Sequence, residues 1–267
     1  MSKIFDCITF FKENFITNLR FEILNDYVDF FVICESRFDH RGKKKKLYFK
    51  LLNKKYRKKI IYLVLNKPFN KQNSPWKNQA IQRDFILKEL NVAGPDDYIM
   101  FSDPDEIPNP KIFKKFNLKK KFGIFLQKMY CYKFNLYNKH ESLWEGTRIC
   151  KKKNLLSIDY MRQKILSKNL NKSFLKFYKE KSIEIFKNGG WHFNSVMSPS
   201  EISKKLKTFA HTEFSNKKYS NIIKIKKNIQ SYRDLFGRGI YYKKVNLDSS
   251  FPKYILENKK KLKKWIL

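Results

Sequence analysis

Strand-like and helix-like runs alternate along the N-terminal part of the chain, and this order restricts the possible folds. The strand-like runs cover residues 3–9, 29–34, 60–65 and 98–102. Residues 14–24 place Phe15, Leu19 and Ile23 at four-residue intervals, as in a helix with one apolar face, and residues 76–90 resemble a second such helix. Strand–helix–strand units connect parallel strands and put helices on the faces of the sheet. We therefore predict an α/β fold with a Rossmann-type, mainly parallel sheet flanked by helices.

The second half of the chain is less regular but contains clear local signals. An aromatic run over residues 122–132 predicts another strand. Ser198 and Glu201 have the spacing of a capping box, with a proline between them at the first helical position, which predicts a helix ending near residue 209. A further helix is expected over residues 221–236. These signals predict a helical C-terminal region.

The chain is strongly basic, with 59 Lys and Arg against 24 Asp and Glu and a net charge of +35. Such a charge suits a polyanion- or nucleic-acid-binding protein, which is one alternative function. The Lys residues are spread along the whole sequence, however, and no helix-turn-helix, zinc-finger or RNA-recognition motif is present. We therefore expect no nucleic-acid partner.

Cysteine usage and hydropathy indicate where the chain works. No run of 18 apolar residues occurs, and the N-terminus does not resemble a signal peptide. Cys7, Cys34, Cys131 and Cys150 are far apart and lie in or beside apolar runs, which is typical of buried thiols in a reducing compartment. These features favour a cytoplasmic location.

Carboxylates gather at the end of the strand-like run 98–102. Asp103 and Asp105 follow it directly, and in an extended chain residues two apart point to the same face. Two carboxylates in this position suit a hard divalent cation, Mn²⁺ or Mg²⁺, that in turn holds a phosphate-bearing substrate. The alternative is a solvated acidic loop. In open α/β sheets ligands bind beyond the carboxyl ends of the strands, so this turn and Glu35 at the end of run 29–34 are expected to face one crevice.

Several segments together resemble one known family. The segments are Phe31-Val32-Ile33-Cys34-Glu35-Ser36, then Phe38, His40, Gly42 and Lys45, then Trp76 and Arg83, then Ser102-Asp103-Pro104-Asp105-Glu106-Ile107-Pro108, and then Gly190-Trp191-His192-Phe193. Their order and spacing over residues 3–214 are similar to glycosyltransferase family 17, which has many bacterial members. The sequence departs from the family at Asp39, where relatives often have Thr, and at Asn78 or Gln79, where many have Glu. We also expect no counterpart of the membrane anchor of eukaryotic members.

The resemblance implies a GT-A-like fold and an inverting, metal-dependent transferase. The expected donor is a UDP-sugar, in the first instance UDP-N-acetylglucosamine, and the expected acceptor is a glycan or lipid-linked glycan. Asp105 is the predicted direct metal ligand, with Asp103 contacting the metal or the donor and His192 as a third ligand. The predicted donor-binding residues are Glu35, His40, Lys45, Arg83, Asp103, Trp191 and His192. For five of them structural alternatives stay open: a salt bridge for Glu35, a solvated helix charge for Arg83, an aromatic cluster for His192, a similar structural role for His40 and core packing for Trp191.

Inversion requires a general base near the acceptor hydroxyl. Glu106 belongs with Asp103 and Asp105 in the predicted catalytic set, although strand alternation would aim it away from them, where it would brace the loop. The other candidates for the base are Glu141, Glu145, Asp159 and Glu213. Paired carboxylates would also suit a metal-dependent phosphoesterase or nucleotidyltransferase, which is the remaining alternative function.

The last residues differ from the predicted transferase domain, which we place at residues 1–250. Residues 251–267 are rich in Lys and end in apolar residues. In a helix, Ile255, Leu262 and Ile266 would lie near one stripe, as in an anchor at an anionic membrane surface. We therefore expect peripheral contact with the inner membrane face, the alternative being a helix docked on the core.

Overall fold

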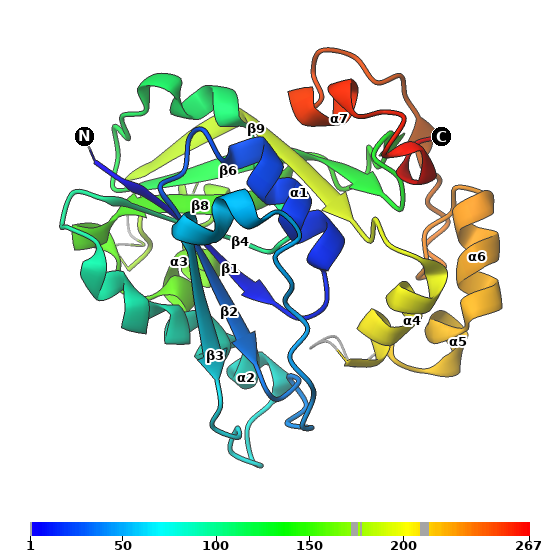
Figure 1. Cartoon of the computed structure of the whole chain (residues 1–267), viewed down its shortest axis with the longest axis horizontal. Helices are drawn as coiled ribbons and strands as arrows, with labels where there is room; N and C mark the ends of the chain where they lie inside the picture. Colours follow the sequence, from blue (N-terminus) through cyan, green and yellow to red (C-terminus); the bar gives the residue numbers. More distant parts are fainter. Residues whose placement is uncertain (1, 172–175, 177, 209–213) are drawn as a thin grey trace.

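The computed structural model describes residues 2–171, 176, 178–208 and 214–267, and one large mixed sheet organises it (Figure 1). Within these residues the strands follow the order β10-β7-β6-β8-β4-β1-β2-β3, and β9 pairs with both β5 and β6. The strands are β1 (Ile4–Phe10), β2 (Phe30–Ser36), β3 (Ile60–Leu65), β4 (Tyr98–Ser102), β5 (Glu106–Pro108), β6 (Phe122–Cys131), β7 (Leu136–Tyr137), β8 (Trp144–Lys151), β9 (Ile183–Asn194) and β10 (Lys243–Lys244).

The N-terminal part of the sheet is parallel, as predicted. β1 lies between β2 and β4, β3 lies beside β2, and all four run in the same direction. Beyond β4 the sheet becomes mixed, because β8 is antiparallel to both β4 and β6. β9 is parallel to β6 and antiparallel to β5. The last pairing brings β9, which is late in the sequence, next to the segment that follows β4.

Helices cover both faces of the sheet, which confirms the predicted layers. They are α1 (Asn14–Leu24), α2 (Pro75–Asp84), α3 (Ile158–Lys164), α4 (Pro199–Thr208), α5 (Lys217–Ser220), α6 (Ile222–Gln230) and α7 (Lys253–Glu257). α1 buries Phe21 and Leu24 against one face, together with Phe31 of β2. On the other face, Ile86 after α2 and Met161 of α3 pack in a second apolar cluster.

The helix predictions are confirmed in place but not always in length. α1 has the predicted bounds, and α4 begins with the predicted capping box, in which the Ser198 amide donates to Glu201 at 2.8 Å. The predicted helix 76–90 is divided, because α2 ends at Asp84 and a 3₁₀-helix over Phe85–Val92 continues it. α6 ends at Gln230, since Tyr232 adopts a positive φ of 57° and the chain then turns back.

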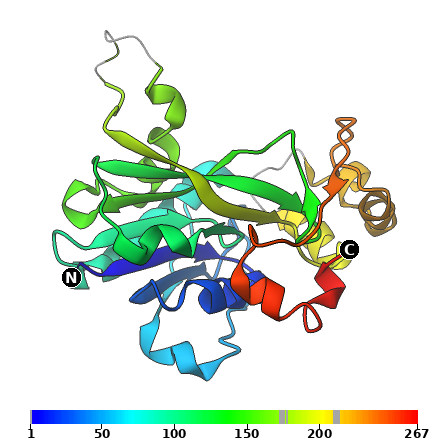
Figure 2. The same ribbon diagram turned by 90° about the horizontal axis from the view of Figure 1, so that it is seen from above.

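The C-terminal segment packs on the core beside α1 (Figure 2). Phe251, Ile255 and Leu262 are buried in the same cluster as α1, and the ring of Trp265 lies 5.3 Å from that of Phe15. The apolar stripe that we expected to face a membrane therefore faces the protein, as in the core-docked alternative. In the part of the chain that the structure describes, no helix is long and apolar enough to cross a membrane.

Candidate active site

A cavity of about 800 Å³ lies at the carboxyl ends of β1, β2 and β4. This is the edge of the sheet at which the sequence predicted a ligand site. The segments that follow these three strands contribute Glu13, Lys45 and the pair Asp103 and Asp105. The other walls come from α2, α3, the start of β8, the end of β9, and α4. Residues from distant parts of the sequence therefore share one cavity.

The acidic segment after β4 is a turn rather than an extended strand. The Glu106 amide donates to the Asp103 carbonyl at 3.0 Å, which closes the turn, and both Asp103 and Asp105 still line the cavity. Arg20, fully buried below the turn, donates to the Glu106 carbonyl at 2.6 Å and to Ser102 Oγ at 2.9 Å. Asp6 neutralises Arg20 at 2.6 Å. The turn is thus fixed from beneath by a buried ion pair.

Glu106 is fully buried, and both of its carboxylate oxygens are occupied. Oε1 accepts from Trp144 Nε1 at 2.6 Å and from Arg162 at 2.7 Å. Oε2 accepts from Arg162 at 3.0 Å and from the Asp103 amide at 3.1 Å. Glu106 does not line the cavity. Its predicted place in the catalytic set is therefore corrected to bracing the turn, because a carboxylate with four donors has no open position for an acceptor hydroxyl.

Asp105, by contrast, makes only long contacts with its charged neighbours. Its Oδ1 lies 3.6 Å from His192 Nε2, and its Oδ2 lies 3.4 Å from Lys205 Nζ. Its side chain is 8% exposed. The Lys205 ammonium also lies 3.9 Å from Glu13. Burial lowers the pKa of Lys205, but the carboxylates of Asp105 and Glu13 outweigh this effect and raise it, so the side chain is a cation at neutral pH.

β9 places His192 beside the acidic turn. His192 is the register partner of Glu106 in the β5–β9 pair, next to Asp105. Two residues earlier, Gly190 has a φ of +128°, and a Cβ atom there would lie 2.2 Å from the Ile107 carbonyl oxygen. Only glycine permits this approach. Gly190 therefore permits the close pairing of β9 with β5 that brings His192 beside the acidic turn.

Asp103 is paired with an arginine on α3. Arg162 donates to it at 3.0 Å while also holding Glu106. Burial raises the pKa of Asp103, but the surrounding cations, first of all Arg162 and Arg83, outweigh it and lower the value to about 2. Asp103 is therefore an anion throughout the physiological range.

These residues fit a divalent cation in their chemistry. Asp105 Oδ1 and His192 Nε2 lie 3.6 Å apart at the cavity, where the carboxylate suits Mn²⁺ or Mg²⁺ and the imidazole adds a nitrogen ligand. His192 Nδ1 is buried and has no hydrogen-bond partner among the described residues. Within the same residues, no group of three or more His, Cys, Asp or Glu side chains is placed to hold a metal ion. A cation here would need further oxygens from its ligand or from water.

Glu35 does not line the cavity, in contrast to its predicted contact with the nucleotide. It is fully buried, and it accepts from Lys45 Nζ, the Tyr48 amide, the Phe49 amide and the Tyr62 hydroxyl at 2.8–3.0 Å. Its carboxylate fastens the segment after β2 to the sheet. The salt-bridge alternative is the observed one, with Lys45 as the partner, while Lys45 itself lines the cavity.

Arg83 and His40 both line the cavity, on the side formed by α2. Arg83 is paired with Asp159 at 2.9 Å and is 4% exposed, and its Nε has no hydrogen-bond partner among the described residues. It is therefore not a solvated helix charge. His40 Nε2 lies 3.0 Å from Gln82 Oε1. Burial lowers the pKa of His40, so its imidazole is neutral at pH 7.

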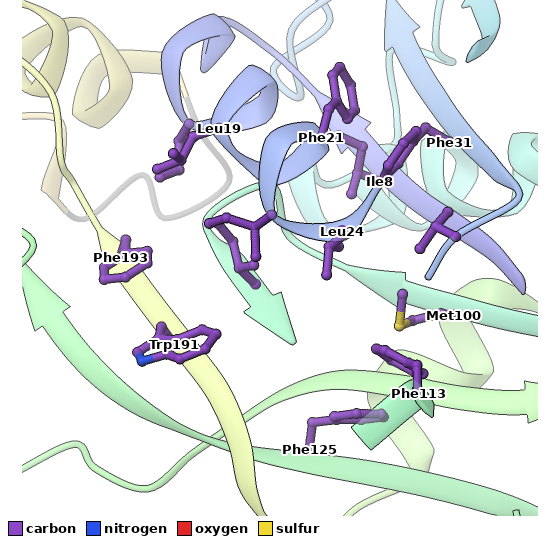
Figure 3. Close-up of a cluster of buried hydrophobic side chains, with 14 of the residues drawn as sticks. Ile8, Leu19, Phe21, Leu24, Phe31, Met100, Phe113, Phe125, Trp191 and Phe193 are labelled. Carbon is purple, nitrogen blue, oxygen red and sulfur yellow. The ribbon is translucent and has the colours of Figure 1, made fainter. Parts of the chain in front are cut away.

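Trp191 points away from the cavity, although its neighbour His192 points into it. It is buried in the apolar cluster under α1, as Figure 3 shows, and its Nε1 donates to the Ser250 carbonyl at 3.1 Å. Trp191 therefore cannot stack on a ligand in this cavity. Its predicted role in donor binding is corrected to packing in the core. Trp144 does line the cavity, with its ring 5.2 Å from that of His192.

Comparison with known protein families shows to which of them the chain belongs. The family model of Glycosyltransferase family 17 matches residues 1–263, nearly the whole chain. The chain belongs to glycosyltransferase family 17.

Curated relatives match a shorter part of this family 17 chain. The β-1,4-mannosyl-glycoprotein 4-β-N-acetylglucosaminyltransferases of Rattus norvegicus and Homo sapiens are each 31% identical to it over 116 residues. The match covers 40% of this chain and 22% of each relative, so the chain spans much less than the length of these relatives. In a solved structure, a glycosyltransferase involved in the glycosylation of the major capsid of PBCV-1 aligns with 69% of this chain and 81% of its own, at 9% identity and a TM-score of 0.31.

The family 17 chain also has site residues that the sequence did not single out. Arg20, Arg162 and Lys205 contact the acidic turn, yet each is one of 59 basic residues with no distinguishing motif. Of the carboxylates considered as a general base, Glu145 lines the cavity and is paired with Arg148 at 3.1 Å. Asp159 is paired with Arg83, and Glu141 with Arg238. Glu213 lies outside the described residues. Glu13, not considered from sequence, lines the cavity too.

Proposed function

We propose that this protein is an inverting, metal-dependent glycosyltransferase that moves a sugar, N-acetylglucosamine in the first instance, from a UDP-sugar to a hydroxyl of a glycan acceptor. Family membership and the names of the curated relatives support glycosyl transfer and the choice of sugar. The observation that carries the proposal is the incompletely paired Asp105, which faces His192 in a cavity at the carboxyl ends of the parallel strands. Parallel α/β sheets bind ligands at this edge.

The reaction requires one bond to form and one to break. The acceptor hydroxyl oxygen bonds to the anomeric carbon, the bond from that carbon to the β-phosphate oxygen breaks, and the electron pair leaves with the diphosphate. The acceptor proton passes to a carboxylate. Glu13 is the first carboxylate proposed for this step, because it lines the cavity outside the Asp103–Asp105 pair and its Oε1 lies 3.9 Å from its ionic neighbour Lys205. Glu145 is the second, although Arg148 and Ser167 already donate to it.

The remaining site residues hold the donor. Asp105 and His192 would bind the cation, with Asp103 beside them; when bound, Mn²⁺ or Mg²⁺ supplies positive charge against the leaving diphosphate. Arg83 lines the cavity beside its partner Asp159, and we propose that its guanidinium donates to a phosphate oxygen of the donor. Arg162 keeps Asp103 ionised and in place. Trp144 closes the wall beside His192.

A thermal-shift comparison with Mn²⁺ and UDP, GDP, CDP or dTDP tests the donor. Ligand that binds only the folded protein raises the melting temperature, and at one hundred times Kd it stabilises by about 2.7 kcal/mol. We expect the largest shift with UDP and Mn²⁺ together. A clear preference for GDP would contradict the UDP donor, and stabilisation by an oligonucleotide alone would favour the polyanion-binding alternative.

The products of slow donor hydrolysis give a second test. Incubation with UDP-N-acetylglucosamine and Mn²⁺ should release UDP and free sugar, because the bond at the anomeric carbon is the one that breaks. Release of UMP would instead indicate attack at phosphorus, as in a phosphoesterase or nucleotidyltransferase. The acceptor can then be sought among glycans and lipid-linked glycans by mass analysis of the products.

A further inference from the structure

Lys205 is directed at the acidic turn by the helix that carries it. On α4, Ile202 and Leu206 are buried in an apolar cluster that includes Ile225 of α6. Lys205 lies on the side of the same helix that lines the cavity, whereas its neighbour Lys204 is exposed. The capping box at the start of α4 and these buried contacts fix the rotation of the helix. The position of the Lys205 side chain is therefore set by the fold.

The charge contacts of Lys205 are long in comparison with those of the other cations around the turn. Its ammonium lies 3.4 Å from Asp105 Oδ2 and 3.9 Å from Glu13 Oε1. Both carboxylate side chains are nearly buried, at 8% and 10% exposure, while the Lys205 side chain is 26% exposed. The Lys205 ammonium is thus close enough to be attracted by both carboxylates but makes no short hydrogen bond with either.

The arginines of the site are already committed to short contacts. Arg162 holds Glu106 at 2.7 Å and the Gly146 carbonyl at 2.8 Å, and Arg83 holds Asp159 at 2.9 Å. A long, flexible ammonium with loose contacts can change its partner at much lower cost than a guanidinium in a fixed, buried bridge. Among these cations, Lys205 is the one whose geometry permits exchange.

We propose that Lys205 is a diphosphate-binding residue, and that its pairing with Asp105 is the donor-free arrangement; this rests on the proposed function. When the diphosphate of the donor enters, the Lys205 ammonium leaves Asp105 for the phosphate oxygens. In transfer it then neutralises the negative charge that the β-phosphate oxygen gains as its bond to the anomeric carbon breaks. Asp105, freed from its ammonium partner, is available to a cation.

This role predicts two effects of opposite sign for Lys205→Met. Binding of UDP should weaken, because the diphosphate loses a charge-assisted contact. Binding of Mn²⁺ without nucleotide should tighten, because an ammonium near Asp105 repels a second cation and competes for the same oxygen. A lysine that only supported the fold would lower both affinities, since the site as a whole would loosen.

The experiment compares Lys205→Met and Lys205→Arg with Lys204→Met, a matched control on the same helix. Mn²⁺ binding without nucleotide is followed by electron paramagnetic resonance, UDP binding at saturating Mn²⁺ by calorimetry, and folding by thermal melting. We expect Lys205→Met to weaken UDP binding by about tenfold or more and to tighten Mn²⁺ binding by roughly threefold. Lys205→Arg should bind UDP within about threefold of the parent protein, and Lys204→Met should change neither affinity.

The outcomes separate this inference from the proposed function. If the unmodified protein binds UDP with Mn²⁺ but Lys205→Met binds it equally well, the role of Lys205 is wrong and the proposed function stands. If both affinities fall together and the melting temperature drops below that of Lys204→Met, Lys205 is a structural residue and the inference is also overturned. If the unmodified protein binds no UDP, the proposed function itself fails.

Discussion

Two neighbouring carboxylates, Glu106 and Asp105, have opposite environments in this molecule. Glu106 has no exposure and four donors at 2.6–3.1 Å. Asp105 faces the cavity, with His192 and Lys205 at 3.6 and 3.4 Å. The sequence presents them as adjacent acidic residues, but only one has oxygens that a ligand could still use. The number and length of existing contacts therefore distinguish a bracing carboxylate from one available for chemistry.

Glu35 extends the same comparison to the neighbouring strand. Like Glu106 it follows the pattern of a functional acid at a strand end, and like Glu106 it is buried with short bonds to its own chain. Saturated acids of this kind hold the loops that shape the cavity. Substitutions should therefore separate the two kinds of carboxylate, affecting stability at Glu106 and ligand binding at Asp105.

The largest effect is expected for Glu106→Ala. This change leaves the buried Arg162 without its main carboxylate partner, and breaking a buried pair in this way costs about 3–5 kcal/mol. Urea unfolding should show the loss as a lower midpoint, and Asp105→Asn should change the free energy of unfolding by less than about 1 kcal/mol. Equal losses in the two variants would contradict the distinction drawn between them.

Asp105→Asn should have the next largest effect, and on function rather than folding. Removal of a charged ligand at the proposed cation should lower the rate of UDP release from the donor on the order of 100-fold, about 2.7 kcal/mol. UDP binding should weaken in the same variant. Full activity of the unmodified protein in excess EDTA would show instead that no cation takes part.

Gly190→Ala tests whether the close pairing of β9 with β5 is needed to keep His192 beside Asp105. The new Cβ would collide with the Ile107 carbonyl, and the positive φ would be strained, at a cost of about 1–3 kcal/mol. We expect lower stability together with weaker Mn²⁺ binding, because β9 must shift at the Pro108–Gly190 pair, two residues from His192. Gly237→Ala is the control, since its φ is also positive but nothing lies within 4 Å of the added Cβ.

The smallest effect concerns pH, at the α2 side of the cavity. Burial lowers the pKa of His40 in the folded protein below its ordinary value of 6.5. Between the folded pKa and 6.5, the imidazole is therefore protonated in the unfolded chain but not in the folded chain. The stabilisation from neutral His40 is present above pH 6.5 and decreases as the pH falls toward the folded pKa. His40→Gln should flatten this part of the stability profile in urea unfolding, and identical slopes in both proteins would contradict the assignment.

Local sequence pattern predicted the parallel half of the sheet and α1 closely, because each of these elements is determined by its own apolar spacing. Local pattern also pointed to Asp103 and Asp105, the family resemblance added His192, and all three line the cavity. Local pattern could not predict which face of β9 would hold Trp191, since alternation gives opposite faces but not their partners. The saturation of Glu35 depends on the amides of Tyr48 and Phe49, which fold back over β2 for reasons outside any local pattern.

The same dependence on distant pairing has a consequence for synthesis of the chain. β1 to β4 and the acidic turn leave the ribosome well before β9 and α4, which complete the cavity with His192 and Lys205. Domains generally begin to fold from the N-terminal side, and long-range strand pairing forms slowly. A nascent chain would thus carry a formed acidic turn without the residues that complete its site, so donor binding should begin only after α4 has emerged and β9 has paired with β5.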